Sequence, residues 1–169
     1  MLKRMSSVLA VVLLTLVSVQ NVQGQIGRKA GPGGDPRVAK LLDQIGWKYE
    51  VDKDGDFKLL FNLENDRTHL VYVMSKTEKL RGLEIREVWA PGFRVGEDPD
   101  PEVLLHLLKE NGRKKVGAWR VIGTGDRQMA VFAVQIEAEA DAETMKTIVT
   151  AVIETADQLE KEVTDADEF

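Results

Sequence analysis

The sequence predicts an α+β domain in which helices pack on one antiparallel sheet. The first observation is a one-sided helical pattern over residues 141–163, where apolar residues recur at steps of three and four. The second is a series of strand-like runs over residues 47–89, joined by links too short for a parallel crossover. The third is that single helical patterns separate the groups of strands. The expected order is helix, three or four strands, helix, two strands, helix.

The first helix is predicted over residues 36–45. Asp35 is a suitable N-cap, and Pro36 falls at the first helical position, where its missing N–H costs nothing. Gly46 is suited to end the helix in a left-handed conformation. The apolar stripe of this helix consists of Val38, Leu41, Leu42 and Ile45.

Four strand-like runs follow and should form an antiparallel meander. Asp54-Gly55 is a strong signal for a tight turn between the first two runs. The third run, THLVYVMS, is apolar on both faces, so it is predicted to lie in the middle of the sheet. The approximate ranges of the four runs are 47–52, 57–63, 68–75 and 82–89.

A loop and a second helix are predicted next. Pro91-Gly92 interrupts the strand pattern, so the loop should begin there. Asp100 caps the helix, Pro101 is its first residue, and Asn111-Gly112 ends it. The residues predicted to be buried in this helix are Val103, Leu104, Leu107 and Leu108. The basic residues that follow, at 113–115, suit the negative end of a helix better than a binding patch.

Two further strands, over residues 116–122 and 128–136, precede the closing helix. Asp141 is the predicted cap of that helix, and the face opposite its apolar stripe is charged. The stripe must therefore be buried, and the preceding strands offer the surface for it. Its members are Met145, Ile148, Val149, Val152, Ala156, Leu159 and Val163.

Residues 1–24 have the pattern of a secretory signal peptide. Lys3 and Arg4 precede an uncharged, mostly apolar run of 14 residues, which is shorter than the ~20 residues that a membrane-spanning helix needs. Cleavage before Gln25 is therefore preferred to retention as an anchor, and the protein is expected to be exported, to the periplasm or the extracellular space. Residues 25–34 are a Gly-rich flexible leader, residues 35–164 are a single α+β domain, and residues 165–169 are an acidic tail.

The charge balance disfavours two kinds of partner. Without Lys3 and Arg4, 21 basic residues remain against 28 acidic ones, a formal charge of −7. An acidic domain repels phosphate backbones and anionic lipid, so neither nucleic acid nor a membrane surface is an expected partner. The chain contains no Cys, so its stability must come from the packed core.

No motif in the sequence carries recognisable chemistry, so no catalytic, cofactor-binding or metal-binding residue is predicted. His69 and His106 are the only histidines, lack neighbours at ligand spacing and are predicted to lie at the surface or its rim. Ser75 is the only serine after the predicted cleavage and has no nucleophile motif around it. The acidic run 52–56 resembles a calcium loop but lacks its Gly and Glu positions, and a hairpin turn is preferred. Residues 123–128 lack the third Gly of a dinucleotide fingerprint.

Two aromatic residues are candidates for contact with a partner. Trp89 and Phe93 flank the Pro-Gly turn, and a turn of this type presents its neighbours rigidly. Exposed aromatic residues are enriched at protein interfaces. The preferred alternative is that both rings plug the end of the sheet.

The order of elements from Asp35 to Val163 resembles that of the YbjN family, which shares the fold of type III secretion chaperones. The resemblance is carried by VAKLLDQIGWKYEVDKDGDF, by the hydrophobic hairpin at 57–75 and by the segment RQMAVFAVQIEAEADAETMKTIVTAVIETADQLEKEV. It implies a small α+β domain of bacterial origin, often dimeric, that binds other polypeptides and performs no chemistry. The family defines no functional residues that can be assigned to positions in this sequence.

The resulting expectation is an exported, non-enzymatic domain that binds a protein partner or a second copy of itself, without a cofactor. An enzyme that uses paired carboxylates, such as a hydrolase, is the first alternative and requires two acids converging in a pocket with a displaced pKa. A structural protein of the cell envelope is the second alternative.

Overall fold

The computed structural model describes residues 33–164 and 167–169. This part of the chain contains three helices and six strands, together with two short 3₁₀ turns at Glu64–Asp66 and Gly125–Arg127. The predicted signal peptide and most of the predicted leader lie outside the described residues. The elements are α1 (Pro36–Ile45), β1 (Glu50–Val51), β2 (Phe57–Asn62), β3 (Thr68–Leu80), β4 (Leu83–Arg94), α2 (Pro101–Asn111), β5 (Ala118–Ile122), β6 (Met129–Glu137) and α3 (Ala142–Thr164).

All six strands belong to one antiparallel sheet with the order β1-β2-β3-β4-β6-β5. The predicted meander is therefore confirmed over β1 to β4, and the α+β class is confirmed for the described chain. The predicted helix over residues 36–45 is confirmed at both ends, because Asp35 accepts a hydrogen bond from the Arg37 amide and Gly46 adopts φ 82°.

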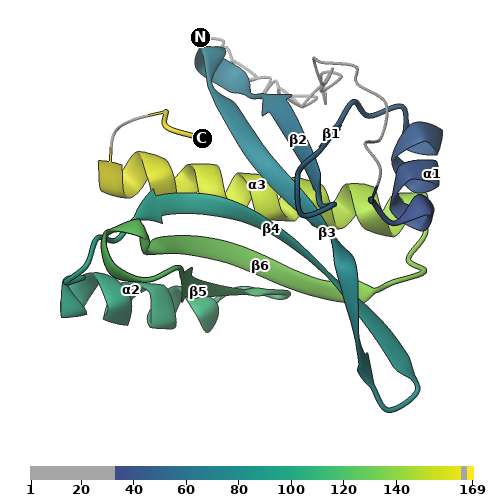
Figure 1. Ribbon diagram of the computed structural model, residues 1–169. Coiled ribbons are helices and arrows are strands. Elements are labelled where there is room, and N and C mark those ends of the chain that lie inside the picture. The colour runs from purple at the N-terminus through teal and green to yellow at the C-terminus, as the bar shows by residue number, and fades with distance from the viewer. Residues whose placement is uncertain (1–32, 165–166) are drawn as a thin grey trace, which may run out of the picture.

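The closing helix α3 covers one face of the sheet (Figure 1). Its apolar stripe packs against β4, β6 and β3, and α1 lies beside α3 on the same side. Helix α2 instead follows the edge of β5, where the Asn111 side chain hydrogen-bonds the backbone N–H and C=O of Trp119. The core cluster thus lies on the side of the sheet that α3 covers. On the other side Tyr72, Met74 and Trp89 are partly exposed, whereas Val131 and Ala133 are buried.

Strands β3 and β4 are longer than predicted. The register shifts between Val73 and Thr77, after which the two strands continue together to the pair Leu80↔Leu83. This extension, residues 76–85, projects beyond the rest of the sheet (Figure 1) and is called the hairpin arm below. Its alternation is hidden in the sequence because most of its residues are charged or small.

The loop predicted at Pro91-Gly92 is wrong, because β4 runs through both residues to Arg94. The register shifts between Pro91 and Phe93, which marks a β-bulge. A proline, which has no N–H to donate to the neighbouring strand, is tolerated at such a bulge. Gly92 is required at this point, since a Cβ atom there would lie 2.6 Å from the Trp119 ring.

Two further predictions for single elements need correction. The predicted first strand is only two residues long in the structure. In α2, Leu107 is buried but Leu108 is 67 % exposed, so its predicted burial is wrong. The helix lies along a sheet edge rather than on a face, and a narrower stripe is therefore enough to dock it.

A buried arginine joins α1 to the bulge in β3. The side chain of Arg86 is 1 % exposed and its Nη2 atom lies 2.6 Å from Asp35 Oδ2. Its Nη1 atom donates to the carbonyl oxygens of Met74 and Ser75 in the bulge. Burial alone would raise the pKa of Asp35, but hydrogen bonds from Arg37 and Arg86 hold that pKa well below its ordinary value.

Among the described helices, none has the length and apolar character required to cross a bilayer.

Candidate functional site

The uncovered face of the sheet carries an ordered aromatic cluster. Tyr72 and Trp89 stack with their ring centroids 4.3 Å apart and their planes within 9° of parallel. The Trp89 indole N–H points at the sulfur of Met74, 3.1 Å away. The two rings come from directly paired positions on β3 and β4. We call the side of the sheet opposite α3 the open face.

The structure separates the two aromatic residues that the sequence singled out. Trp89 is partly exposed on the open face. Phe93 is 4 % exposed in the hydrophobic core, so its ring is not available to a partner. Phe93 therefore matches the alternative in which the ring is buried at the end of the sheet. Tyr72 and Met74 were not predicted, because their position beside Trp89 depends on the register between two strands.

Next to the aromatic cluster the open face is hollowed. The hollow has a volume of about 540 Å³ and lies between the hairpin arm and the central strands. Across its floor, Arg120 forms an ion pair with Glu87, which also accepts a hydrogen bond from Gln135. The side chains around it are Met74, Lys76, Glu78, Lys79, Leu80, Ile85, Glu87, Arg120 and Gln135.

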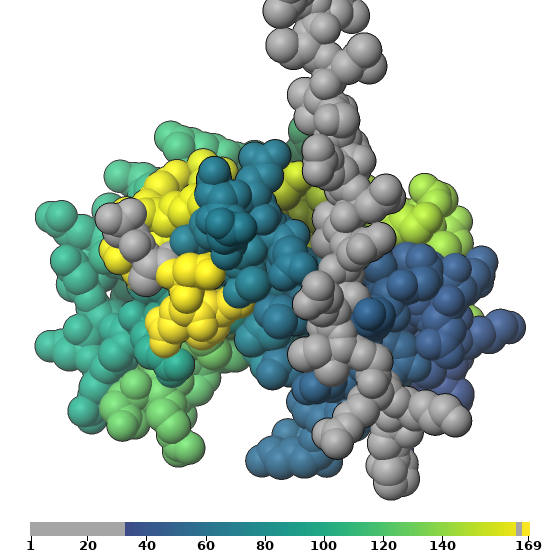
Figure 2. All heavy atoms as spheres, turned by 90° about the horizontal axis from the view of Figure 1, so that it is seen from above, coloured from purple at the N-terminus to yellow at the C-terminus, as the bar shows by residue number. Residues whose placement is uncertain are grey.

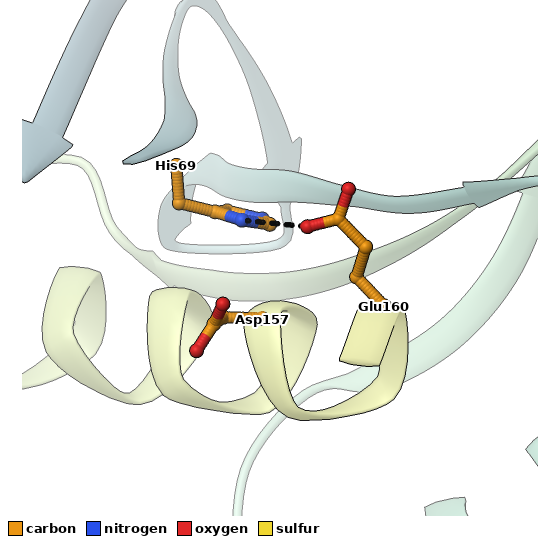
Figure 3. A group of neighbouring side chains, drawn as sticks. All are labelled: His69, Asp157 and Glu160. Carbon is orange, nitrogen blue, oxygen red and sulfur yellow. Dashed lines mark ion pairs between the residues drawn. The ribbon is translucent and has the colours of Figure 1, made fainter. Parts of the chain in front are cut away.

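A second group of polar residues is buried under α3. His69, Asp157 and Glu160 approach one another there, and both His69 and Glu160 are fully buried (Figure 3). The prediction that His69 lies at the surface is wrong. Its side chain points to the α3 side of β3, and its acidic neighbours are about ninety residues later in the sequence, where no local pattern reveals them.

The hydrogen bonds of this cluster define the tautomer of the histidine. Nε2 of His69 lies 2.8 Å from the carbonyl oxygen of Pro91, which can only accept, so Nε2 carries the proton. Nδ1 has no hydrogen-bond partner among the described residues and lies 3.7 Å from Glu160 Oε2. In the neutral ring, a lone pair therefore faces a carboxylate.

The three residues do not fit a metal ion, although their ligand atoms lie within 4.8 Å of one another. Arg67 already bridges the two acids, with Nε 2.7 Å from Asp157 and Nη2 2.7 Å from Glu160. Lys161 lies 2.5 Å from the other Asp157 oxygen. The Arg67 guanidinium thus takes the place that a metal ion would have between the two acids, and the cluster is a buried ion-pair network.

The C-terminal residues Asp167 and Glu168 pack beside this network and hydrogen-bond to it and to β3. The backbone N–H of Glu168 donates to Glu160 Oε1 at 2.7 Å, and the Glu168 side chain pairs with Arg94. The carboxylate of Asp167 accepts from the backbone N–H of Thr68. The yellow C-terminal end lies beside the blue residues around β2 and the start of β3 in Figure 2.

The model of the YbjN family, described as "Putative bacterial sensory transduction regulator", matches residues 35–165. The chain belongs to the YbjN family. No curated protein matches the chain. The matched region includes the open face, the hairpin arm and the buried network of this YbjN domain.

We expect the buried His69 to make this YbjN domain less stable in mild acid. Burial lowers the pKa of His69 below its ordinary value, although the Pro91 carbonyl and Glu160 oppose the shift. Below about pH 6.5 the unfolded chain binds a proton at this residue that the folded chain resists. The free energy of unfolding should therefore decrease as the pH is lowered through this window, by at most about 1.4 kcal/mol per pH unit from this residue.

Urea titrations at several values between about pH 7.5 and about pH 5.5 measure this slope. His69→Gln, which keeps an N–H for the Pro91 carbonyl, should flatten it. His106→Gln removes the other, exposed histidine and should leave the slope unchanged. An unaltered slope in His69→Gln would assign the acid sensitivity to other groups.

Proposed function

We propose that the chain is a non-enzymatic, regulator-like domain that binds a polypeptide partner on the open face of its sheet. The observation that carries the proposal is the Tyr72–Trp89 stack with Met74, which no described helix covers. Stacked aromatic rings beside a hollow are the kind of surface that anchors protein interfaces. The family's description as a regulator agrees with a binding role.

The alternative of a carboxylate enzyme has less support from the geometry. Such an enzyme needs two acids that converge in an accessible pocket. The buried acids Asp157 and Glu160 are held by Arg67, while Glu87 in the hollow is paired with Arg120. YbjN is not known as an enzyme family, which points in the same direction.

Export and a chaperone-like mode of binding are further parts of the proposal. They rest on the signal-like pattern of residues 1–24 and on the resemblance to secretion chaperones. Expression of the full chain in a bacterium, followed by fractionation and N-terminal sequencing, tests the first part. A protein that begins at Gln25 in the periplasm or medium is expected, and full-length protein confined to the cytoplasm would contradict export.

Photocrosslinking tests the binding role of the open face. A benzoylphenylalanine residue at position 72 should capture a partner in living cells, whereas the same residue at position 150 on the outer side of α3 should not. Trp89→Ala should weaken capture roughly thirtyfold, the effect of removing a hot-spot tryptophan. Thermal melts of each variant establish that the fold is intact.

The mass of the adduct identifies the kind of partner. A product of twice the chain mass indicates self-association, which sedimentation of the purified protein would then verify. A product of another mass indicates a different polypeptide. Equal capture from positions 72 and 150, or none from position 72, would contradict binding on the open face.

A further inference from the structure

The end of the described chain folds back onto the domain. Residues 167–169, called the tail segment below, lie against the start of β3 and the last turns of α3. The Asp167 carboxylate accepts a hydrogen bond from the Thr68 N–H at 3.2 Å. The Glu168 N–H donates to the buried Glu160 carboxylate at 2.7 Å. The tail segment is thus held by its backbone as well as by a side chain.

The last two side chains of the tail segment both contact one arginine at the end of β4. The Glu168 carboxylate forms an ion pair with Arg94, and the Phe169 ring centroid lies 5.7 Å from the guanidinium carbon of the same arginine. Among the described residues, Glu168 is the only carboxylate that pairs with Arg94. Arginine recognises carboxylates by charge-assisted hydrogen bonds and aromatic rings by cation–π contact. The contacts therefore describe a site for an acidic residue followed by an aromatic one.

The groups that receive the tail segment are fixed by the rest of the domain. Asn65 and Asp66, with φ 59° and 58°, form a tight hairpin turn that fixes the start of β3 and the Thr68 N–H. Arg67 holds Glu160 in place at 2.7 Å. Neither arrangement involves the tail segment, so the receiving groups keep their positions when the segment leaves.

The tail segment itself is held mainly by contacts at the surface. Asp167 and Glu168 are exposed, and the side chain of Arg94 is 60 % exposed. Ion pairs of this kind contribute little to stability and are weakened by salt. The buried carboxylate of Glu160, by contrast, requires a donor. Another segment that supplies the same N–H and carboxylates is therefore able to replace the tail segment.

The net charge around the site does not select its ligand. Glu64 and Asp66 in the adjacent turn are acidic, and Arg67 is already shared by Asp157 and Glu160. The chemistry of the ligand follows instead from the segment that occupies the site, in which each of the two carboxylates meets its own donor.

We propose that the tail segment is an exchangeable latch, which occupies in cis a binding site for an acidic–aromatic segment of another polypeptide. The incoming segment donates a backbone N–H to Glu160, and its carboxylates contact Thr68 and Arg94. Because the tail segment must leave first, the latch keeps the site closed until a competing segment is present. The site lies beside α3 and is separate from the open face, so the inference goes beyond the proposed function.

NMR spectra of the isotope-labelled protein test the inference through the Thr68 amide signal. Asp167→Lys with Glu168→Lys, called the open variant, should free the site and move this signal. A peptide with the sequence of residues 163–169, blocked at both ends, should return the signal toward its wild-type position. The wild type should bind the peptide roughly tenfold more weakly, because its own tail segment competes at an effective concentration in the mM range. Equal binding to both proteins, or none to the open variant, would overturn the inference.

Two matched substitutions in the open variant locate the binding. Arg94→Gln should weaken the peptide up to about fivefold, as expected for the loss of an exposed ion pair. Arg113→Gln removes another exposed arginine, after α2, and should have no effect. A second peptide with Asn and Gln in place of the residues that correspond to Asp167 and Glu168 should also bind more weakly. Equal effects of the two arginine substitutions, or equal binding of the two peptides, would count against the proposed site.

Thermal melts establish whether the open variant is folded. If it is not, Asp167→Asn with Glu168→Gln takes its place, because this pair removes the two charges without introducing repulsion. A tail segment that only seals the buried network gives a different result. Both variants then melt at a lower temperature than the wild type and neither binds the peptide, and this outcome would reject the exchangeable latch.

Discussion

Replacing Arg86 by methionine is expected to destabilise the domain by about 3 kcal/mol, the lower end of the range for breaking a buried ion pair. Methionine fills much of the same space but has no donors. The Asp35 carboxylate would lose the 2.6 Å contact, and the carbonyl oxygens of Met74 and Ser75 would lose their partner in the bulge. The effect is limited because Arg37 continues to pair with Asp35.

Urea titration at neutral pH measures this loss, and Arg37→Met provides the control. Arg37 contacts the same Asp35, together with Glu84 and Glu139, but its side chain is 36 % exposed. Water can replace its contacts, so its loss should cost much less than the loss of Arg86. Similar losses in the free energy of unfolding from the two substitutions would show that the burial of Arg86 does not determine its contribution to stability.

Local signals in the sequence are sufficient for the positions of the helices and for the order of helices and strands along the chain. Helix α1 is delimited by its own cap residues, Asp35 and Gly46, and needs no information from distant segments. In α3 the apolar period alone identifies the buried side, and all but Val163 of its predicted stripe is buried.

The candidate sites depend on contacts that no local pattern contains. Tyr72 reaches Trp89 only because the two strands pair in one register. A strand that is apolar on both faces, such as the start of β3, does not show which side will meet α3. The prediction that His69 lies at the surface or its rim is wrong for this reason. The hairpin arm was missed because its exposed strands bury little and therefore lack the alternation that marks a half-buried strand.

Replacing Arg67 by methionine should be the most damaging single change in the buried network, with a loss of about 3–5 kcal/mol near neutral pH. Glu160 has no exposed surface. Without Arg67, its remaining side-chain neighbours among the described residues are the N–H of Glu168 and the His69 ring. Asp157 is less affected, because Lys161 still contacts it. The main cost is therefore one buried carboxylate without a compensating charge.

The damage should decrease in acid, because an uncompensated buried carboxylate has a raised pKa. The folded variant would bind a proton at Glu160 at a pH where the unfolded chain does not, so its loss of stability relative to the wild type should shrink from about pH 7 to about pH 5.

The double variant Arg67→Met with Glu160→Gln should be more stable than Arg67→Met alone near neutral pH. Its neutral amide removes the buried charge and can donate to Nδ1 of His69, which lacks a partner in the wild type. Urea titrations of the wild type, Arg67→Met and the double variant at about pH 7 and about pH 5 measure these differences in stability. A deficit independent of pH, with no recovery in the double variant, would mean that Arg67 contributes by packing its side chain rather than by neutralising Glu160.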